Sequence, residues 1–163
     1  MAVTWTSPHT YVTGELLTKS FMDTQWRDNL LWLKTPTESG NITFAADVTT
    51  SSTSYVDVTG VTTTITTFGG GLDVDWRCTL LSSLASSVVF QLVIDGVSEE
   101  ILGTAAVSTT TNIESSFRHH VAALAAGSHT IKIQVKTSAG TLTIRGTTSA
   151  IGDPLFYVRE AGA

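Results

Sequence analysis

The chain has 163 residues, of which 42% are hydrophobic and only 14% charged, and its formal net charge is −5. No Lys or Arg occurs between Lys34 and Arg77, and phosphate backbones are bound through clustered cations, so the sequence argues against direct nucleic-acid binding. No stretch reaches the roughly 20 apolar residues of a membrane-spanning helix and no signal peptide is recognised, so we expect a protein made in a cytoplasm without a membrane anchor.

Hydroxyl side chains take the place of the missing charges, with 29 Thr and 17 Ser in the chain. Threonine is β-branched and packs well on a pleated sheet, so this composition favours strands over helices. The low charge has two explanations: a solvated β surface covered by hydroxyl groups, or an exterior covered by neighbouring subunits. The single cysteine, Cys78, can form neither an intrachain disulfide nor a zinc site alone, and it is predicted to be a small buried hydrophobic residue.

Residues 1–36 are predicted to form an N-terminal segment, followed by a β domain over residues 37–163. Three of the four tryptophans lie in this segment. Pro8 biases the preceding residue away from a helix and Gly14 permits a turn, so residues 1–14 are expected to form an extended arm. An aromatic segment ahead of a β domain favours a protein that is anchored and displayed over one that catalyses.

One α-helix is predicted to follow the arm, beginning at Glu15 or Ser20 and ending at Lys34. Ser20 and Asp23 have capping-box spacing, and Lys34 suits the negative end of the helix dipole. Pro36 cannot continue the helix. A helix of about 15–20 residues is marginal alone in water, so we expect it to pack on its own β domain, on partner subunits or on a particle.

Large apolar residues cover one side of the predicted helix. Met22, Trp26, Leu30 and Leu33 are spaced by four, four and three residues, which is the spacing of one helical face. Aromatic side chains bury a large area at a low cost in conformational entropy. The residues predicted to anchor the protein are Trp5, Tyr11, Phe21, Met22, Trp26, Leu30, Trp32 and Leu33.

From residue 37 onward, apolar residues alternate with hydroxyl or charged residues, which is typical of half-buried strands. Strands are predicted over residues 42–48, 54–59, 61–68, 72–81, 88–94, 97–102, 114–124, 129–136, 141–145 and 155–160, and residues 104–112 are predicted to be loop or weak strand. Asp95-Gly96 lies between two apolar runs and indicates a two-residue type I′ hairpin. Short strands without intervening helices predict a mainly β fold, an antiparallel sandwich or barrel.

Four histidines are the main candidates for metal or acid–base chemistry. His119 and His120 are adjacent on a predicted strand and point to opposite faces, so they cannot chelate one metal ion without a bulge. His129 follows a turn and could face either of them. No Gly-x-Ser-x-Gly nucleophile motif occurs. We therefore expect no metal site, no cofactor and no enzymatic activity.

Two carboxylate pairs have spacings that could suit a glycosidase, but nothing else in the sequence indicates a sugar cleft. Asp73 and Asp75 share one strand face, and Glu99 and Glu100 follow the predicted hairpin. Charges at strand edges discourage aggregation, and this is the role predicted for both pairs. The glycines at positions 69–71 lack the following Lys and helix of a phosphate-binding loop.

Two stretches of the chain resemble small virion proteins of tailed bacteriophages. The first is Trp5-x-x-Pro8-x-x-Tyr11-x-x-Gly14-Glu15-Leu16-Leu17-Thr18, with Arg27-Asp28-Asn29-Leu30 and Leu33-Lys34 after it. The second is Asp95-Gly96, then Leu124-Ala125-Ala126-Gly127-Ser128-His129-Thr130-Ile131-Lys132 with Gly140-Thr141, closing on Leu155 and Val158-Arg159-Glu160. The second stretch looks like jelly-roll heads related in shape to tumour necrosis factor, and such heads are typically trimeric. The resemblance implies an antiparallel jelly-roll sandwich with a structural or display role in a virion.

The resulting interpretation is a homotrimeric phage virion protein that decorates a capsid or forms a head fibre. Its N-terminal segment would dock on other virion proteins of the capsid or tail, and its β domain would face outward. The alternative is a tail-tip or fibre protein that binds a host receptor or glycan. Glycan binding usually needs exposed aromatic rings, whereas Tyr55, Phe68 and Trp76 all fit core positions.

Overall fold

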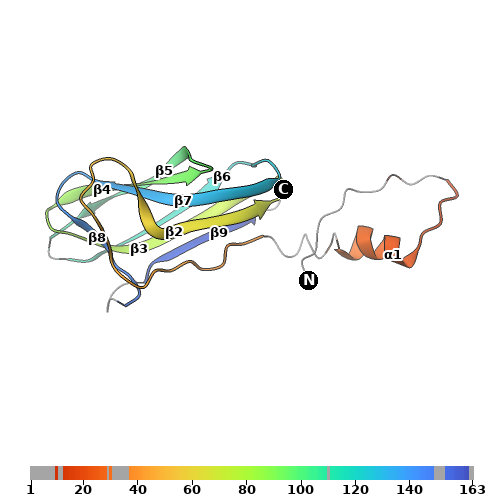
Figure 1. Ribbon diagram of the computed structural model, residues 1–163, viewed down its shortest axis with the longest axis horizontal. Helices are drawn as coiled ribbons and strands as arrows, with labels where there is room; N and C mark the ends of the chain where they lie inside the picture. Colours follow the sequence, from red (N-terminus) through yellow and green to blue (C-terminus); the bar gives the residue numbers. More distant parts are fainter. Residues whose placement is uncertain are drawn as a thin grey trace.

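The computed structural model describes residues 10, 13–28, 30, 37–109, 111–148 and 153–161. Figure 1 shows a β sandwich and, apart from it, a short helical segment. Four predicted anchoring residues fall in the described part: Phe21, Met22, Trp26 and Leu30. The other four, Trp5, Tyr11, Trp32 and Leu33, lie outside the described residues, as do most of the predicted arm and the predicted end of the helix at Lys34.

The described part of the β domain contains nine strands in two antiparallel sheets. They are β1 (Val48–Thr50), β2 (Val56–Thr67), β3 (Gly71–Ser82), β4 (Ser86–Ile94), β5 (Val97–Val107), β6 (Ile113–Val121), β7 (Gly127–Thr137), β8 (Leu142–Ile144) and β9 (Leu155–Ala161). One sheet has the order β1-β8-β3-β6, with β9 also paired to β3, and the other has the order β2-β7-β4-β5. We call them the first and the second sheet. Successive strands cross repeatedly between the sheets, which is the jelly-roll arrangement. The predicted fold class is confirmed.

Strand β3 organises the first sheet. Its whole length up to Leu80 pairs with β6 on one side, while its other side pairs with β9 through Arg77 and then with β8 from Leu80 onward. Residues 38–42 bridge to β9, with Glu38 opposite Arg159 and Ile42 opposite Phe156. The beginning and the end of the β domain therefore lie side by side.

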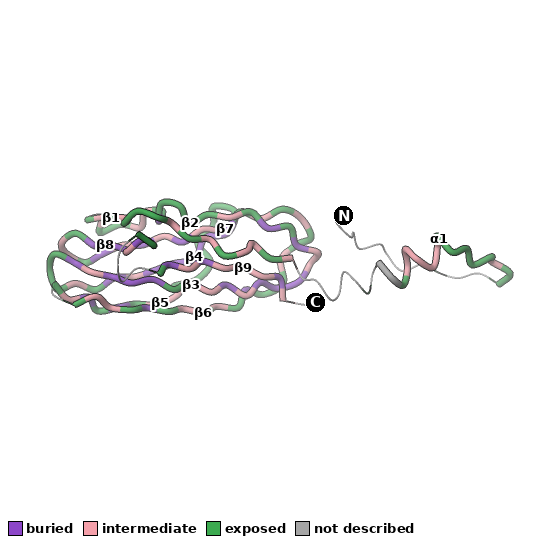
Figure 2. The backbone as a smooth tube through the Cα atoms, turned by 90° about the horizontal axis from the view of Figure 1, so that it is seen from below, coloured by how far each residue is buried: buried purple, intermediate pink, exposed green. Residues whose placement is uncertain are grey.

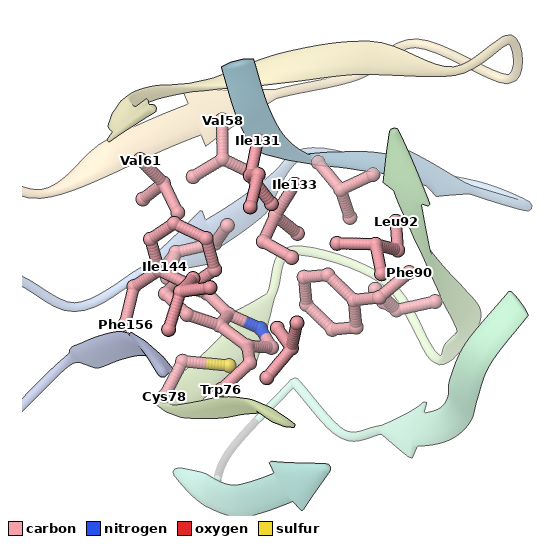
Figure 3. Close-up of a cluster of buried hydrophobic side chains, with 14 of the residues drawn as sticks. Val58, Val61, Trp76, Cys78, Phe90, Leu92, Ile131, Ile133, Ile144 and Phe156 are labelled. Atoms are coloured by element: carbon pink, nitrogen blue, oxygen red, sulfur yellow. The ribbon is translucent and has the colours of Figure 1, made fainter. Parts of the chain in front are cut away.

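Inward-facing residues of both sheets form one hydrophobic core. Trp76 on β3 lies at its centre, with its ring centroid 6.0 Å from Phe90 of the second sheet and 6.4 Å from Phe156 of the first (Figure 3). Cys78 is 1% exposed, so the prediction of a small buried residue is confirmed. The indole Nε1 of Trp76 is the one buried side-chain nitrogen or oxygen of the described residues without a hydrogen-bond partner.

Two strands are longer than predicted because pairing with distant strands carries them past local breaks. Strand β2 runs through Gly60, which adopts a φ of +82°, and its register against β7 shifts between Asp57 and Thr62. The β-bulge absorbs the glycine that the sequence suggests as a strand end. Strand β5 continues to Val107, where Ala105 and Val107 are buried against β4. Of residues 104–112, predicted to be loop or weak strand, the first four belong to this strand.

One expectation near the start of the β domain needs correction. Residues 42–48 do not form one strand, because the carbonyls of Phe44 and Ala45 accept hydrogen bonds from the backbone of Thr147 and Thr148 instead of from a ladder partner.

The Asp95-Gly96 hairpin is confirmed, since both residues have positive φ, 51° and 84°, as a type I′ turn requires.

The helical segment starts between the two predicted positions, Glu15 and Ser20, and is less regular than predicted. Helix α1 covers Lys19–Met22, and its N-cap is Thr18, whose Oγ1 accepts a hydrogen bond from the backbone of Phe21 at 3.2 Å. The expected Ser20–Asp23 capping box is therefore wrong, since Asp23 instead forms an ion pair with Lys19 at 2.6 Å. A π-helical turn continues over Asp23–Asp28. In Figures 1 and 2 the segment lies beyond one end of the sandwich, so the expected packing on its own β domain is not observed for its described residues.

The open side of the sandwich between β5 and β6 is closed by an aromatic ring lying on a glycine. A Cβ atom placed on Gly103 of β5 would lie 2.0 Å from the Phe117 ring of β6. That ring also packs against Phe90, with the centroids 5.5 Å apart. Gly103 therefore permits a close approach between the two sheets that no larger residue allows.

We predict that Gly103→Ala destabilises the protein by about 1–3 kcal/mol, the usual cost of overpacking a filled core. Chemical denaturation with constant slope would measure the loss. Phe117→Leu provides the control, because removing the ring leaves room for the new methyl group. The double variant should lose less stability than the sum of the single variants, and strict additivity would contradict the proposed contact.

Candidate functional site

The N-terminal segment joins the sandwich at one of its two ends. At one end, the backbone of Glu160 donates to the carbonyl of Thr37 at 2.8 Å, so the chain leaves the N-terminal segment beside the last strand. Leu124 donates to the Gly70 carbonyl at the same end. We call this the attached end. Figure 1 shows the helical segment beyond it.

The opposite end, which we call the distal end, consists of turns rich in serine and threonine. Backbone hydrogen bonds tie these turns together: Ser83 to Thr141 at 3.0 Å, Ser138 to Ser87 at 2.9 Å, and Thr137 to Ser52 at 2.9 Å. Because each turn is bonded to another, the distal end presents a fixed surface. This surface lies at the far end of the domain from the N-terminal segment.

A buried carboxylate fixes the attached end. Glu160 is 4% exposed, and its Oε1 accepts hydrogen bonds from the backbone of Phe68 at 2.7 Å and Gly70 at 3.1 Å. A Cβ atom on Gly70 would lie 2.5 Å from the carbonyl oxygen of Ala161. The β2–β3 turn is thus held against the last strand, which also positions the point where the N-terminal segment joins the domain.

The predicted anchoring residues of the helical segment are largely exposed. Trp26 is 58% exposed and Leu30 59%, while Phe21 and Met22 are half-buried. Leu16 and Leu17, which the sequence analysis did not select, are 83% and 51% exposed. Exposed large apolar residues grouped in one short segment are a common sign of a surface that binds another protein.

The described residues include no group of three or more His, Cys, Asp or Glu side chains that could hold a metal ion. His119 and His120 lie on opposite faces of β6, as expected, and His120 pairs with Asp73 at 2.9 Å. Burial raises the pKa of the Cys78 thiol well above its usual range, so this residue stays protonated. None of the described helices is long and apolar enough to cross a membrane.

His129 has a structural role near the attached end. Its Nδ1 lies 2.7 Å from a carboxylate oxygen of Asp95 and its Nε2 lies 2.8 Å from the carbonyl of Ala125. Both partners are acceptors, so the arrangement favours a ring that donates from both nitrogens. The hydrogen bond that His129 donates to Asp95 is the main cause that raises the pKa of His129, and the same bond lowers the pKa of Asp95. Neither ring nitrogen is available as a base or ligand.

The outer face of the first sheet carries cross-strand ion pairs. Asp73 lies between Arg159 at 2.8 Å and His120, and Asp75 pairs with Arg118 at 3.4 Å. Hydrogen bonding, chiefly from Arg159, lowers the pKa of Asp73. The prediction that Asp73 and Asp75 are edge charges is wrong, because β3 is paired on both sides and the carboxylates stabilise the centre of the sheet.

A shallow hollow of about 270 Å³ lies on the same face. It is lined by Asn41, Asp75, Trp76, Arg77, Ser116, Leu155 and Tyr157. Its charged groups are already engaged: Arg77 pairs with Asp153 at 2.6 Å, Asp75 pairs with Arg118, and the Tyr157 hydroxyl donates to Glu38. A ligand there would have to displace existing pairs.

No described protein family matches the chain, and no curated protein matches it. Solved structures do match in fold. One is the structure of infectious bursal disease virus Gt strain, with a TM-score of 0.52 and 16% sequence identity. The match covers 78% of this chain and 38% of the viral chain. The structure of Eiger TNF from S. frugiperda is 17% identical with a TM-score of 0.44, over 79% and 96% of the two chains.

A carbohydrate-binding module from Cellvibrio mixtus lichenase 5A, solved with cellotriose, is 16% identical with a TM-score of 0.35, over 76% and 98% of the two chains. The chain spans 38% of the length of the viral protein that it matches. At these identities the similarities concern the fold alone. The fold resembles the jelly rolls of viral capsid proteins.

We predict that the His129–Asp95 pair makes stability depend on pH. The raised pKa of His129 adds stability fully below about pH 6.5, its ordinary value, and this stability is lost as the pH rises through the folded-state pKa. The lowered pKa of Asp95 adds stability above about pH 4 that is lost on acidification through the folded-state pKa. The free energy of unfolding should therefore fall as the pH rises above about 6.5, the ordinary pKa of histidine.

His129→Gln should remove this decline and cost about 1 kcal/mol at pH 6, since Asp95 is half exposed and solvent weakens the pair. Denaturant titrations at several pH values measure both effects. Asp95→Asn provides the matched control, because it removes the other partner and should flatten the same pH range. Equal pH slopes in the wild type and both variants would refute the assignment.

Proposed function

We propose that this protein is a structural protein of a tailed-bacteriophage virion, attached by its N-terminal segment and displaying its jelly roll. The observation that carries the proposal is the exposed apolar surface of Trp26 and Leu30 on a segment that lies beyond the attached end. The similarity in fold to a viral capsid jelly roll supports it. The motifs in the first 36 residues resemble those of tailed-phage virion proteins, and this resemblance is the reason for proposing a tailed phage.

The proposed partners are other virion proteins of the capsid or tail, and two further copies of the chain. The arrangement needs no catalytic group, metal or cofactor, so we assign no enzymatic activity. Capsid decoration or a head fibre is the preferred location. The alternative is a tail-tip or fibre protein that binds a host receptor or glycan, and the number of copies per particle separates the two: hundreds of copies indicate decoration, and a few indicate the tail.

We predict that Trp26→Ala weakens attachment to the particle. Truncating a Trp buried at an interface costs on the order of 3–5 kcal/mol, so the affinity for the particle should fall at least about a hundredfold. At limiting protein concentration the occupancy of the particle should fall accordingly. Particles lacking the protein, mixed with purified variants and sedimented, would report the occupancy. A chain beginning near residue 37 should likewise fail to join the particle.

Leu84→Ala is the matched control for this experiment. Leu84 is 54% exposed, as Trp26 is, but it lies in a turn at the distal end. Its truncation should leave attachment unchanged. Full occupancy by the Trp26 variant, or equal losses in both variants, would disprove the division into an attached and a displayed end.

We predict that the purified protein is a homotrimer. A closed threefold assembly would cover part of the sparsely charged exterior. Light scattering should give three times the chain mass of 17.3 kDa, about 52 kDa. The control is a dilution series at micromolar concentrations, and a stable monomer throughout the series would exclude the trimer.

A further inference from the structure

We propose that a hollow at the distal end, on the outer face of the second sheet, binds an anionic sugar through Lys136. The inference rests on the proposed display function, because it places a recognition site on the end that faces away from the particle. It concerns a sugar that carries a carboxylate or a phosphate. Such sugars are common units of surface polysaccharides.

The hollow is built by residues of the paired strands β4 and β7, by the turn after β7 and by the loop between β1 and β2. Its volume is about 250 Å³, below the roughly 300–1,000 Å³ of pockets for drug-sized ligands, which suits a single sugar ring. It is lined by Thr53, Ser87, Val89, Lys136, Thr137 and Ser138. The Ser87 amide donates to the Ser138 hydroxyl at 2.9 Å and the Ser138 amide donates to the Ser87 carbonyl at 2.9 Å, so the rim is preorganised.

Lys136 differs from the other basic residues whose side chains the structure describes. Each of the others lies within 3.4 Å of a carboxylate oxygen: Lys19 of Asp23, Arg77 of Asp153, Arg118 of Asp75, Lys132 of Asp57, Arg145 of Asp47, and Arg159 of Asp73. The Lys136 ammonium has no carboxylate partner among the described residues. Its Nζ lies 4.4 Å from the centre of the Tyr55 ring.

This arrangement leaves a positive charge fixed but not neutralised. A cation over an aromatic face is attracted to the ring, yet keeps its charge and its free N–H donors. In an acidic chain whose other basic residues with described side chains are all paired, such a charge beside a hollow is a local attraction for an anion. The exposed hydroxyl groups of Thr53, Ser87 and Ser138 can both donate to and accept from sugar hydroxyls, whereas the Thr137 hydroxyl is buried and donates to the carbonyl of Ala139.

The same geometry argues against a neutral sugar. Neutral sugars are commonly held by stacking on an exposed aromatic face, but none of the described residues that line the hollow is aromatic, and Lys136 covers one face of the neighbouring Tyr55 ring. The hollow on the first sheet is the weaker candidate, because its Arg77 and Asp75 are already paired. The free charge of Lys136 therefore selects both the site and the class of ligand.

Saturation-transfer NMR on the full-length protein tests the proposal, since it detects weak ligands of large or oligomeric proteins. The probes are glucuronic acid and glucose 6-phosphate, with glucose as the neutral counterpart and inorganic phosphate as the competitor without a sugar. We expect signals from the two anionic sugars, weakened by added salt, and none from glucose. Inorganic phosphate should compete poorly.

Lys136→Met should reduce the affinity for the anionic sugars at least about tenfold, and Lys136→Arg should retain binding. Lys132→Met is the matched control, because Lys132 lies on the same strand and the same face but is paired with Asp57, and it should leave binding within about twofold. Thermal unfolding of each variant shows whether the fold is intact. If Lys136→Met unfolds, the Lys136→Arg and Lys132→Met comparison and the probe series still decide the question.

Equal signals from glucose and glucuronic acid would overturn the anionic selectivity. Competition by inorganic phosphate as strong as that by glucose 6-phosphate would reduce the hollow to a general anion site and overturn the sugar assignment. Loss of binding in Lys132→Met equal to that in Lys136→Met would place the ligand elsewhere. Particle attachment by Lys136→Met should be normal, so failure of this proposal is distinguishable from failure of the proposed function.

Discussion

The packing of the Trp76 indole between the two sheets is the contact on which the rest of the sandwich depends. The ring meets Phe156 of its own sheet and Phe90 of the facing sheet, both edge-on, at 6.4 and 6.0 Å. Its strand is also the one that β6, β8 and β9 all pair with. The same strand, β3, therefore determines the pairing within one sheet and the distance to the other sheet. The positions of β6, β8 and β9 depend on it. The cross-strand ion pairs of Asp73 and Asp75 form on the opposite face of the strand for the same reason.

Local sequence patterns were sufficient to predict the elements whose structure depends on neighbouring residues in the sequence. The alternation of apolar and polar residues along β3 and the Asp95-Gly96 dipeptide both led to correct predictions, since periodicity and turn chemistry are local properties. The extents of β2 and β5 were not predictable in this way. Gly60 and Gly103 look like strand ends, yet a bulge absorbs the first and the Phe117 ring covers the second. Both outcomes depend on partners distant in sequence.

The residues of the candidate sites also fall into those predictable from local sequence and those that depend on distant contacts. Exposed apolar residues such as Trp26 were predictable from composition and spacing. Lys136 was not, because its importance lies in the lack of a carboxylate partner among the described residues and in its contact with Tyr55, and both depend on the register of β7. Tyr55 and Phe68 are half-buried, so of the three aromatic residues assigned to the core only Trp76 belongs to it. The exposed threonines along β2 account for part of the low charge without any neighbouring subunit.

The burial of Cys78 has a practical consequence. Maleimide reagents attack the thiolate, and the only thiol of the chain is enclosed in the core with its pKa raised by burial, so the folded protein is unreactive towards them. A cysteine introduced on the surface, for example by Ser138→Cys, would then be the single labelling site without removal of the native thiol. Fluorophores placed in this way at either end of the sandwich would report the orientation of the domain on an assembled particle.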